Sequence, residues 1–355
     1  MKSPPKDPSE HLLHGLLGEL TANATLVISG ARLARQLKVS RWAVWRAVEH
    51  LRRLGVQVRG HPATGYQLAA VPDLLLPELL RPNLRSPLFG RHIAHAFRID
   101  STQAAAQQAA QREEPEGSLF LAEEQTAGRG RQGHRWNSPA GAGLYLSLLL
   151  RPSGPPPLLL PLMLAAGLAV RQAIAEACPV QPDLRWPNDV LLEGKKCAGI
   201  LLEMQAEATR IHWAVLGIGI NVGAMDFPDE LRPLATSLAE HCPRPPTRVG
   251  LCARLLELLE ARYRQAQEGQ SAAIRAEFER ASSYARDRRL VIGEEPETWR
   301  GRSEGLDEAG FLRVRREADG ELITVVTGPV RPAGDNREWE NSAGAAGTGG
   351  EPQGC

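Results

Sequence analysis

Cysteine patterns typical of metal or redox sites are missing from this sequence. Its five cysteines stand at positions 178, 197, 242, 252 and 355, with no C-x-x-C pair and no zinc-site spacing. Its carboxylates do not cluster in a way that would hold a metal ion by protein ligands alone. We therefore predict no protein-held metal site. An odd, scattered set of cysteines fits a reducing cytoplasm.

Signals for export or membrane insertion are also lacking. The N-terminal residues include Pro4, Pro5 and Pro8 in place of the apolar core of a signal peptide. The most apolar run, residues 158–170, is too short to span a bilayer and contains Pro161. We expect a soluble, cytoplasmic protein with no membrane partner.

A strong net charge is absent too, because 42 basic and 41 acidic side chains leave a formal charge of +1. The molecule as a whole is therefore not a general binder of polyanions. The charge is nevertheless uneven, since residues 30–60 carry eight basic side chains and a single acidic one, Glu49. This local basic block predicts one module that faces nucleic acid. At 355 residues the chain is long enough for two or three domains.

The basic block lies in residues 1–70, whose pattern predicts a winged helix-turn-helix. Leucines at helical spacing predict a first helix over 9–20, and a second short helix fits 31–37. Ser40 is a good N-cap for a third helix. Short apolar runs at the two ends of 56–68 flank a turn and predict a hairpin. Three helices followed by a hairpin make up a winged helix-turn-helix.

The third predicted helix carries two tryptophans on its exposed face. Trp42, Trp45 and Arg46 fall together at the spacing of a surface that reads DNA. Tryptophan is unusual there, because base edges are mostly read by Arg, Asn, Gln and Ser, and one or both rings could instead pack against a neighbouring domain. The alternative for the whole block is a small helical interaction domain with solvated arginines. The predicted DNA-binding residues are Arg32, Ser40, Arg41, Trp42, Trp45, Arg46 and Arg59.

The rest of the chain divides into four stretches. Residues 71–90 contain four prolines and predict a stiff connector. Residues 91–284 mix helices with adjacent antiparallel strands, which is typical of an α+β domain. Residues 285–331 read as short strands separated by turns and predict a small, SH3-like β-barrel. Residues 332–355 are glycine-rich, with almost no apolar content, and predict a disordered tail. The predicted class is a multidomain α+β protein.

The glycine–arginine loop, Gly128-Arg-Gly-Arg-Gln-Gly133, matches G-x-G-x-x-G, the fingerprint of dinucleotide-binding folds. That fingerprint needs a helix to begin inside it, so that a pyrophosphate can sit on the helix N-terminus. Here Trp136 and Pro139 follow, and then an alternating strand, so no helix can begin. The loop instead joins two strands. Arg129 and Arg131 on its mobile backbone predict closure over an anionic ligand.

Three further segments carry groups that could bind a ligand. Arg185-Trp-Pro-Asn-Asp189 presents an amide and a carboxylate at the end of a strand. Gly194-Lys-Lys-Cys-Ala-Gly-Ile-Leu-Leu-Glu203 brings Lys196 to the start of a strand, and its Gly199 allows a ligand to approach closely. Leu216-Gly-Ile-Gly-Ile-Asn221 is a buried strand whose glycines leave room for a flat ligand. Each alone has an ordinary explanation as a solvated turn, a cap or tight packing. Their order along one chain is far more specific than any one of them.

Taken together, these segments resemble the biotin–protein ligase family. The resemblance covers roughly residues 10–330, and the predicted winged helix is similar to that of the bifunctional members, which also repress the biotin operon. It implies a central α+β domain of the biotin/lipoate-ligase type with a mixed sheet. The motifs that carry it are Gln125 through Trp136, Ser138-Pro139, Leu144-Tyr-Leu-Ser147, Trp186-Pro-Asn-Asp189, Lys196-x-x-Gly199-Ile200 and Gly217-Ile-Gly-Ile-Asn221.

The resemblance implies a two-step reaction. Biotin is first adenylated with ATP, and pyrophosphate is released. Biotin is then transferred to one lysine of the biotin carboxyl carrier protein of acetyl-CoA carboxylase. Mg²⁺ is expected with the ATP, held mainly through phosphates and water. The family also implies operator DNA as a partner and a homodimer in the adenylate-bound state.

The resemblance also assigns roles to residues of this sequence. Lys196 is expected to bridge the biotin carboxylate and the α-phosphate, Asp189 to orient or deprotonate the incoming lysine, and Trp136 to stack on adenine. Arg131, Lys196 and Asp189 form the expected catalytic set. Expected biotin contacts are Ser101, Thr102, Gln103, Gln125, Arg129, Gly130, Arg131, Lys196, Gly199 and Gly217. Expected ATP or adenylate contacts are Arg129, Arg131, Trp136, Asn188, Lys196 and Asn221.

The sequence departs from the family pattern at three positions. Gln103 replaces a frequent Asn, and Gln132 and His134 replace frequent arginines. Fewer loop charges could loosen retention of the adenylate or weaken a dimer interface. The main prediction is a bifunctional biotin ligase and repressor. Its three alternatives are a ligase whose winged helix does not regulate, a non-catalytic transcription factor that senses biotin, and a lipoate ligase.

Overall fold

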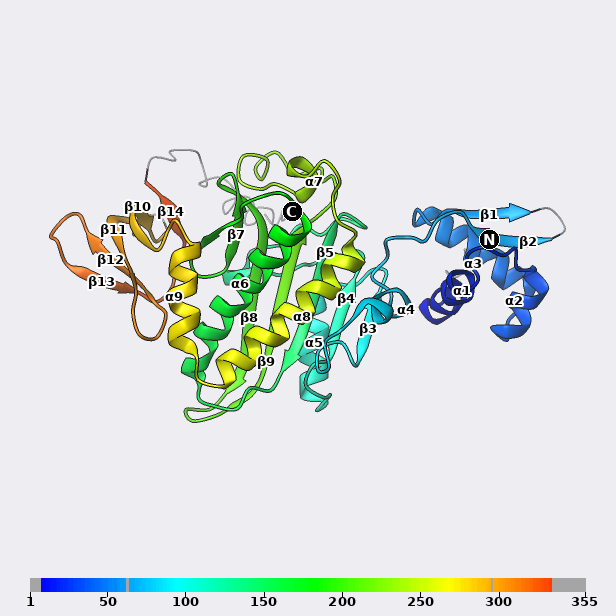
Figure 1. Cartoon of the computed structure of the whole chain (residues 1–355), viewed down its shortest axis with the longest axis horizontal. Helices are drawn as coiled ribbons and strands as arrows, with labels where there is room; N and C mark the ends of the chain where they lie inside the picture. The colour runs from blue at the N-terminus through cyan, green and yellow to red at the C-terminus, as the bar shows by residue number, and fades with distance from the viewer. Residues whose placement is uncertain (1–7, 62–63, 295, 334–355) are drawn as a thin grey trace, which may run out of the picture.

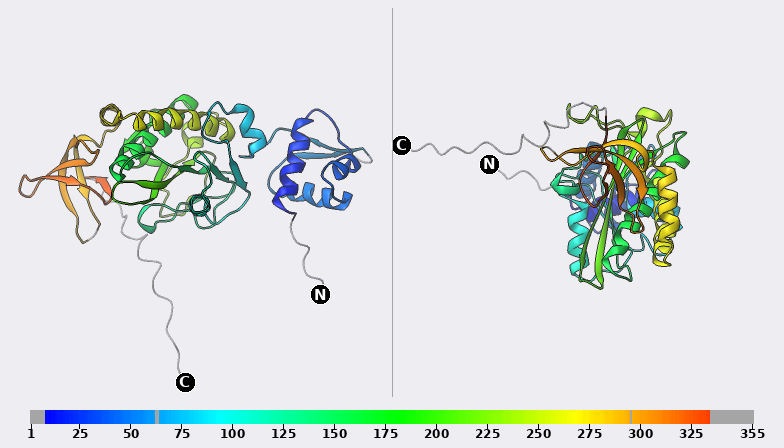
Figure 2. Two further views of the ribbon diagram at one scale, coloured as in Figure 1. Left: turned by 90° about the horizontal axis from the view of Figure 1, so that it is seen from below. Right: turned by 90° about the vertical axis from the view of Figure 1, so that its left-hand side faces the viewer.

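The structure, a computed structural model, describes residues 8–61, 64–294 and 296–333. Three bodies follow one another along its long axis, with the winged helix at one end and a small β-sheet at the other (Figure 1). The same row is seen from below in Figure 2. The predicted multidomain α+β class is confirmed. Nearly all of the predicted tail, and the tip of the predicted hairpin, lie outside the described residues.

The N-terminal body has the predicted three helices and hairpin. Serines stand as N-caps before its helices: the hydroxyl of Ser29 accepts from Arg32 N, and that of Ser40 accepts from Ala43 N. Each cap satisfies a backbone N–H that the first helical turn leaves without a partner. The elements are α1 (Glu10–Ala22), α2 (Gly30–Gln36), α3 (Arg41–Arg53), β1 (Val58–His61) and β2 (Gly65–Leu68).

The α1 helix also contacts the central body. Glu10 accepts the backbone N–H of Phe97 at 3.1 Å, and His14 Nε2 lies 3.1 Å from His95 Nδ1. His95 in turn lies 3.2 Å from the buried carboxylate of Glu123. These contacts join the N-terminal body to the strand that leads towards Ser101.

The proline-rich segment 71–90 packs against the central body instead of crossing open solvent. It contains α4 (Pro77–Leu80) and a 3₁₀ turn, η1 (Arg81–Asn83), and its Leu75 is fully buried. Asp73 accepts from the first backbone N–H groups of α8 (Arg248–Gln267) and so caps that helix. The segment is therefore anchored to the central body.

A seven-stranded mixed sheet forms the middle of the central body. Its first two strands in spatial order are parallel and the remaining neighbours are antiparallel. The spatial order is β3 (Ile93–Ala96), β4 (Leu119–Ala122), β5 (Gly143–Leu150), β9 (Ile211–Asn221), β8 (Lys195–Ala206), β7 (Asp189–Leu192) and β6 (Asp183–Arg185).

Helices cover both faces of this sheet, so its central strands are apolar on both sides. On β5, Leu149 packs with the α5 side while Leu148 and Leu150 pack with the opposite side, because successive side chains of a strand point to opposite faces. The helices are α5 (Thr102–Gln111) on one face and α6 (Leu159–Ala177), α8 and α9 (Ser271–Ala281) on the other, with a 3₁₀ turn, η3 (Pro156–Leu158), before α6.

Helix α6 corrects one prediction. The helical stretch Pro156–Ala177 contains an 18-residue window with a mean hydropathy of 1.8 and is by length and composition able to cross a membrane. The expectation that the apolar run is too short is therefore wrong. Its packing distinguishes it from a membrane span, since Leu164, Ala169 and Ile174 are buried in the core. Composition alone does not separate a core helix from a membrane helix, whereas burial does.

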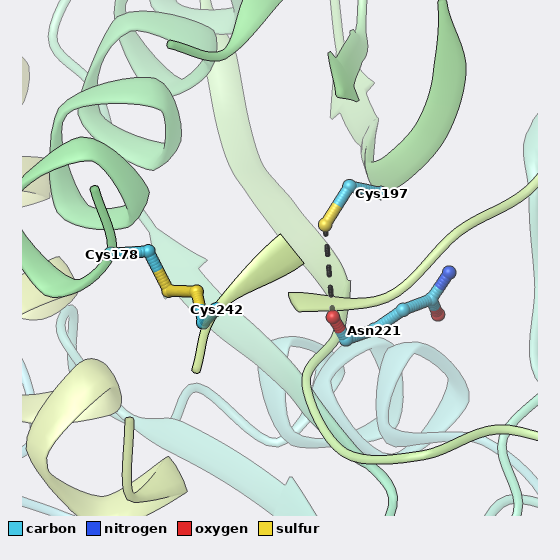
Figure 3. Close-up of a disulfide and its surroundings, with 4 residues drawn as sticks. All are labelled: Cys178, Cys197, Asn221 and Cys242. Carbon is cyan, nitrogen blue, oxygen red and sulfur yellow. Dashed lines mark hydrogen bonds between the residues drawn. A yellow bond between two sulfur atoms is a disulfide. The ribbon is translucent and has the colours of Figure 1, made fainter. Parts of the chain in front are cut away.

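A disulfide joins Cys178, at the end of α6, to Cys242, at the end of α7 (Leu238–His241) (Figure 3). The sequence did not predict this disulfide, since odd, scattered cysteines fit a reducing cytoplasm. The spacing gave no sign of it, because the cysteines are 64 positions apart and meet only where the two helix ends come together. Cys197 and Cys252 are buried free thiols.

The C-terminal body is a five-stranded antiparallel sheet. Its last strand, at the sheet edge, was not predicted. The turn at Gly310 ties this body to the central one, because its carbonyl accepts the indole N–H of the buried Trp186 at 3.0 Å. The spatial order is β13 (Leu322–Val325), β12 (Leu312–Arg316), β11 (Trp299–Leu306), β10 (Arg286–Ile292) and β14 (Val330–Pro332).

Candidate functional site

The first part of the site lies where α5 begins. Ser101 caps this helix, and Ser101 and Thr102 are both buried. Gln125 joins the helix start to the glycine–arginine loop, because its Oε1 accepts the backbone N–H of Thr102 at 2.9 Å and its Nε2 donates to Ser138 Oγ at 2.9 Å. The structure thus brings together residues 23 positions apart that were predicted to bind the same ligand.

Gln103 reaches across the sheet from the first turn of α5. Its Nε2 donates to the backbone carbonyl of Val215, and its Oε1 accepts from Ser147 Oγ at 3.1 Å. A Cβ added at Gly217 would lie 2.5 Å from that Oε1. Position 217 therefore needs a glycine, because any side chain there would collide with Gln103. The role that the structure shows for this predicted binding residue is to make room for Gln103.

The glycine–arginine loop joins β4 and β5, as predicted, with one 3₁₀ turn, η2 (Arg131–Gly133). Its two arginines lie differently. Arg129 is exposed and donates to Gln107 Oε1 at 3.2 Å, whereas Arg131 is half-buried and donates to Asn188 Oδ1 at 3.0 Å. Burial lowers the pKa of Arg131, and the nearby carboxylate of Asp189 opposes that change.

Asp189 lies between two cations. Lys196 Nζ is 2.6 Å from one carboxylate oxygen, and Arg185 donates to the other through NH2 at 2.7 Å and Nε at 3.1 Å. Arg185 and Asp189 are paired in the hairpin of β6 and β7, so the strand register places them side by side. Burial alone would raise the pKa of Asp189, but Lys196 and Arg185 outweigh it and lower the pKa to about 2.

Trp136 lies over the two glycine-bearing strands β8 and β9. A Cβ added at Gly219 would lie 2.4 Å from its ring, and one at Gly199 would lie 3.0 Å from it. Lys196 Nζ is 5.5 Å from the ring centroid. The indole N–H of Trp136 is buried and has no hydrogen-bond partner among the residues that the structure describes. A ligand with a hydrogen-bond acceptor could take the hydrogen bond that this indole N–H offers.

Arg131, Trp136, Asp189 and Lys196 line a cavity of about 1530 Å³, whereas the cluster of Ser101, Gln103 and Gln125 does not. Arg131, Trp136, Asn188, Lys196 and Asn221 all line it, so the expected ATP contacts share one space with the exception of Arg129. Asn221 is buried and is held by a hydrogen bond from its amide to the Thr236 carbonyl at 2.9 Å.

Several residues that line this cavity were not predicted. Arg185 stands in a motif that was singled out, but its pairing with Asp189 is visible only in the strand register. Phe227 and Leu231 come from the segment after β9, which carries no sequence signal. The C-terminal sheet contributes a wall of basic and aromatic side chains: Arg288, Trp299, Arg300, Arg316 and Arg331.

The predicted DNA-binding residues form a separate group on the N-terminal body. Trp42 and Trp45 are 59% and 50% exposed, so neither packs against a neighbouring domain. Arg46 lies over the Trp42 ring, 4.8 Å from its centroid. Ser40 has a structural role as the N-cap of α3. Arg32, Arg41 and Arg59 are exposed on α2, α3 and β1. Within the described residues, no group of three or more His, Cys, Asp or Glu side chains could hold a metal ion.

Comparisons with known proteins match both parts of the chain. Residues 96–221 match the Biotin/lipoate A/B protein ligase family, and residues 16–67 match a helix-turn-helix domain family. The chain is 39% identical to the bifunctional ligase/repressor BirA of Bacillus subtilis, over 80% of this chain and 88% of that protein. It is 30% identical to the bifunctional ligase/repressor BirA of Escherichia coli, over 81% and 88% of the two chains.

A solved structure shares much of this fold. The biotin protein ligase of Aquifex aeolicus, in complex with biotin and ATP, superposes with a TM-score of 0.59 at 28% identity. The match covers 68% of this chain and all of that one.

Proposed function

The chain belongs to the biotin–protein ligase family, in the form that carries an N-terminal helix-turn-helix, and we propose that it joins biotin to protein in an ATP-dependent, AMP-forming reaction. The acceptor is a lysine of the biotin carboxyl carrier protein of acetyl-CoA carboxylase. The observation that carries the proposal is the grouping of Arg131, Asn188, Asp189 and Lys196 at one cavity, in a chain with these relatives.

In the first step, a biotin carboxylate oxygen attacks the α-phosphorus of ATP and pyrophosphate leaves. Two anions must approach each other, so cations are needed where charge develops at phosphorus. Lys196 and Arg131 both line the cavity and supply positive charge, one from strand β8 and one from the loop. Asn188 holds the Arg131 guanidinium towards this point.

In the second step, the amine of the acceptor lysine attacks the carbonyl of the mixed anhydride and AMP leaves. Asp189 is a weak base, because its pKa is about 2 and both its oxygens face cations. We therefore assign it to holding Lys196 and Arg185, and the amine loses its proton to water or to the departing phosphate. Closure of the glycine–arginine loop over the adenylate would keep water from the anhydride.

The biotin ring is assigned to the cluster of Ser101, Thr102, Gln103 and Gln125, with Gly217 as the close-packed floor and Gly130 in the closing loop. Trp136 lies on Gly199 and Gly219, and Lys196 Nζ is 5.5 Å from its ring centroid. We assign this ring to contact with the biotin chain, in addition to the adenine contact expected from the sequence. Mg²⁺ enters with ATP, bound through phosphates and water.

The N-terminal body is assigned to operator DNA, through the exposed face of α3 and the basic residues around it. A homodimer in the adenylate-bound state and a cytoplasmic location complete the proposal. A gel shift on the promoter of the organism's own biotin genes, with and without adenylate, tests the DNA part. No shift at low salt would leave a ligase whose winged helix does not regulate.

The decisive test of the enzyme is ATP–pyrophosphate exchange by the purified full-length protein, with biotin and lipoate in parallel reactions. Exchange with biotin alone is the expected result, and it needs no acceptor protein. Exchange with lipoate would assign the pocket to the other branch of the fold. Exchange with neither would point to a sensor that binds without reacting. An Asp189→Asn enzyme that transfers biotin at full rate would contradict the role of Asp189.

A further inference from the structure

Lys196 is held through its backbone by Leu234–Thr236, a segment that returns to the sheet after β9 has ended. The N–H of Lys196 donates to the carbonyl of Leu234 at 2.7 Å, and the carbonyl of Lys196 accepts the N–H of Thr236 at 3.0 Å. Lys196 and Ala235 thus form a short parallel bridge. The pairing of β8 with β9 begins only at Ala198. The returning segment, Leu234–Thr236, therefore takes the place beside Lys196 that β9 would otherwise fill.

Asn221, the last residue of β9, ties the returning segment to the sheet. Its Nδ2 donates to the carbonyl of Thr236 at 2.9 Å, and both residues are buried. The backbone carbonyl of Asn221 accepts from the thiol of Cys197 at 3.7 Å (Figure 3). Cys197 directly follows Lys196 in the chain. These contacts therefore close a ring that includes the backbone of Lys196.

The ring bears on where the Lys196 ammonium group can lie. Lys196 Nζ is 2.6 Å from Asp189 Oδ1, and both residues line the cavity. If the Asn221 amide were removed, the carbonyl of Thr236 would lose its donor in a buried place, which is unfavourable unless the chain moves. Because the returning segment bonds to both the N–H and the carbonyl of Lys196, the lysine would shift with it.

We propose that Asn221 is a positioning residue for Lys196, which holds the returning segment, and with it the backbone of the lysine, where the biotin carboxylate and the α-phosphate meet. This inference rests on the proposed function and deepens it. It differs from the role expected from the sequence, in which Asn221 contacts ATP itself. The amide supports the difference, because a phosphate oxygen only accepts hydrogen bonds and would have to share the NH₂ group that already donates to Thr236.

The test is a double-mutant cycle in biotin-dependent ATP–pyrophosphate exchange, with wild type, Asn221→Ala, Lys196→Ala and the double variant. A residue that acts only through Lys196 loses its effect once the lysine side chain is gone. We expect Asn221→Ala to lower kcat about tenfold, which corresponds to roughly 1.4 kcal/mol, with the KM for ATP within about twofold. In the Lys196→Ala background, the same substitution should change kcat by less than about twofold.

Asn83→Ala is the matched control. Asn83 Nδ2 also donates to a backbone carbonyl, that of Leu79, at 2.9 Å, but Asn83 does not line the cavity. Its replacement removes the same kind of hydrogen bond and should leave kcat and KM unchanged. Asn221→Ser is made in parallel as a smaller change, and its kcat should fall between those of wild type and Asn221→Ala. Loss of the fold in both Asn221 variants would make Asn221 a structural residue and overturn the inference.

Calorimetric binding of ATP to the four proteins of the cycle, without biotin, gives a second readout that needs no turnover. In the Lys196→Ala background, Asn221→Ala should leave the Kd for ATP within about twofold. A larger rise there would show direct contact with ATP and overturn the inference. An equal fall in kcat in both backgrounds, or a wild-type kcat in Asn221→Ala, would also overturn it. Wild-type protein that shows no exchange with biotin would instead contradict the proposed function.

Discussion

Lys196 Nζ lies 2.6 Å from Asp189 Oδ1, while Arg185 occupies the other oxygen of the same carboxylate. The pairing fixes a flexible lysine at the wall of the cavity, where we propose that the two anionic reactants meet. It also removes Asp189 from consideration as a strong base, because a carboxylate that faces two cations holds a proton poorly.

Asp189→Asn should slow biotin adenylation. Without the carboxylate, Lys196 and Arg185 lose their common partner and repel each other, so Lys196 is no longer held at the reacting groups. We expect ATP–pyrophosphate exchange to fall at least about tenfold, which corresponds to roughly 1.4 kcal/mol of transition-state stabilisation. Asp226→Asn is the control, since Asp226 is 95% exposed and pairs only at the surface with Arg232. Equal rates in the two variants would contradict the assignment.

The same substitution predicts a pH-dependent stability difference. The pKa of Asp189 is lowered from 3.8 to about 2, so its stabilising effect is fully present above pH 4 and is lost as the pH falls towards 2. One pKa unit corresponds to about 1.4 kcal/mol, which makes the effect about 2 kcal/mol at pH 7. Urea unfolding of wild type and Asp189→Asn at pH 7 and pH 3 measures it. If the difference in free energy of unfolding between wild type and Asp189→Asn is larger at pH 3 than at pH 7, the predicted direction of the pH dependence is wrong.

Gly219→Ala should displace Trp136. The new Cβ would lie 2.4 Å from the indole ring, a distance that carbon atoms do not adopt, so the ring must move away from β9. We expect a changed tryptophan fluorescence spectrum and a higher KM for biotin, with the fold intact. Gly223→Ala is the control, because its Cβ meets nothing closer than 3.5 Å. If Gly219→Ala behaves like wild type, as Gly223→Ala should, the Trp136 ring does not lie on Gly219 in solution.

Reduction of the Cys178–Cys242 disulfide should destabilise the central body. The bond closes a loop of 64 positions and thereby restricts the unfolded chain, an effect of about 2–4 kcal/mol. We expect dithiothreitol to lower the thermal midpoint of wild type and to leave that of a Cys178→Ala, Cys242→Ala double variant unchanged. A response to dithiothreitol in the double variant would trace the effect to another group.

Trp42→Ala and Trp45→Ala should weaken DNA binding without changing biotin adenylation. Trp42 is 59% exposed and Trp45 is 50% exposed, so replacing either ring should destabilise the fold little. The exposed face of α3 would lose apolar contact area. Leu26→Ala is the control, because Leu26 is 56% exposed on the same body but lies outside α3. Fluorescence anisotropy with the biotin-gene promoter provides the measurement. Full affinity in both tryptophan variants would move the DNA contact to another surface.

The central motifs were predicted in detail because each depends on local backbone needs. A glycine–arginine loop between two strands, a serine cap before α5 and glycines in a buried strand are all constraints that neighbouring residues impose. The last strand, β14, was missed because three residues around a proline carry too weak a pattern. Helix α6 was judged by composition, which does not report whether a helix is buried.

The sequence by itself determined the order of the helix-turn-helix and ligase parts, the motifs of the candidate site and the family resemblance that the comparisons bear out. Only the tertiary structure decided which groups pair: Arg185 and Lys196 with Asp189, Asn221 with Thr236, and Cys178 with Cys242. The physical reason is that pairing depends on strand register and helix packing. These bring residues from different elements within a few ångströms, and neither residue type nor spacing records that proximity.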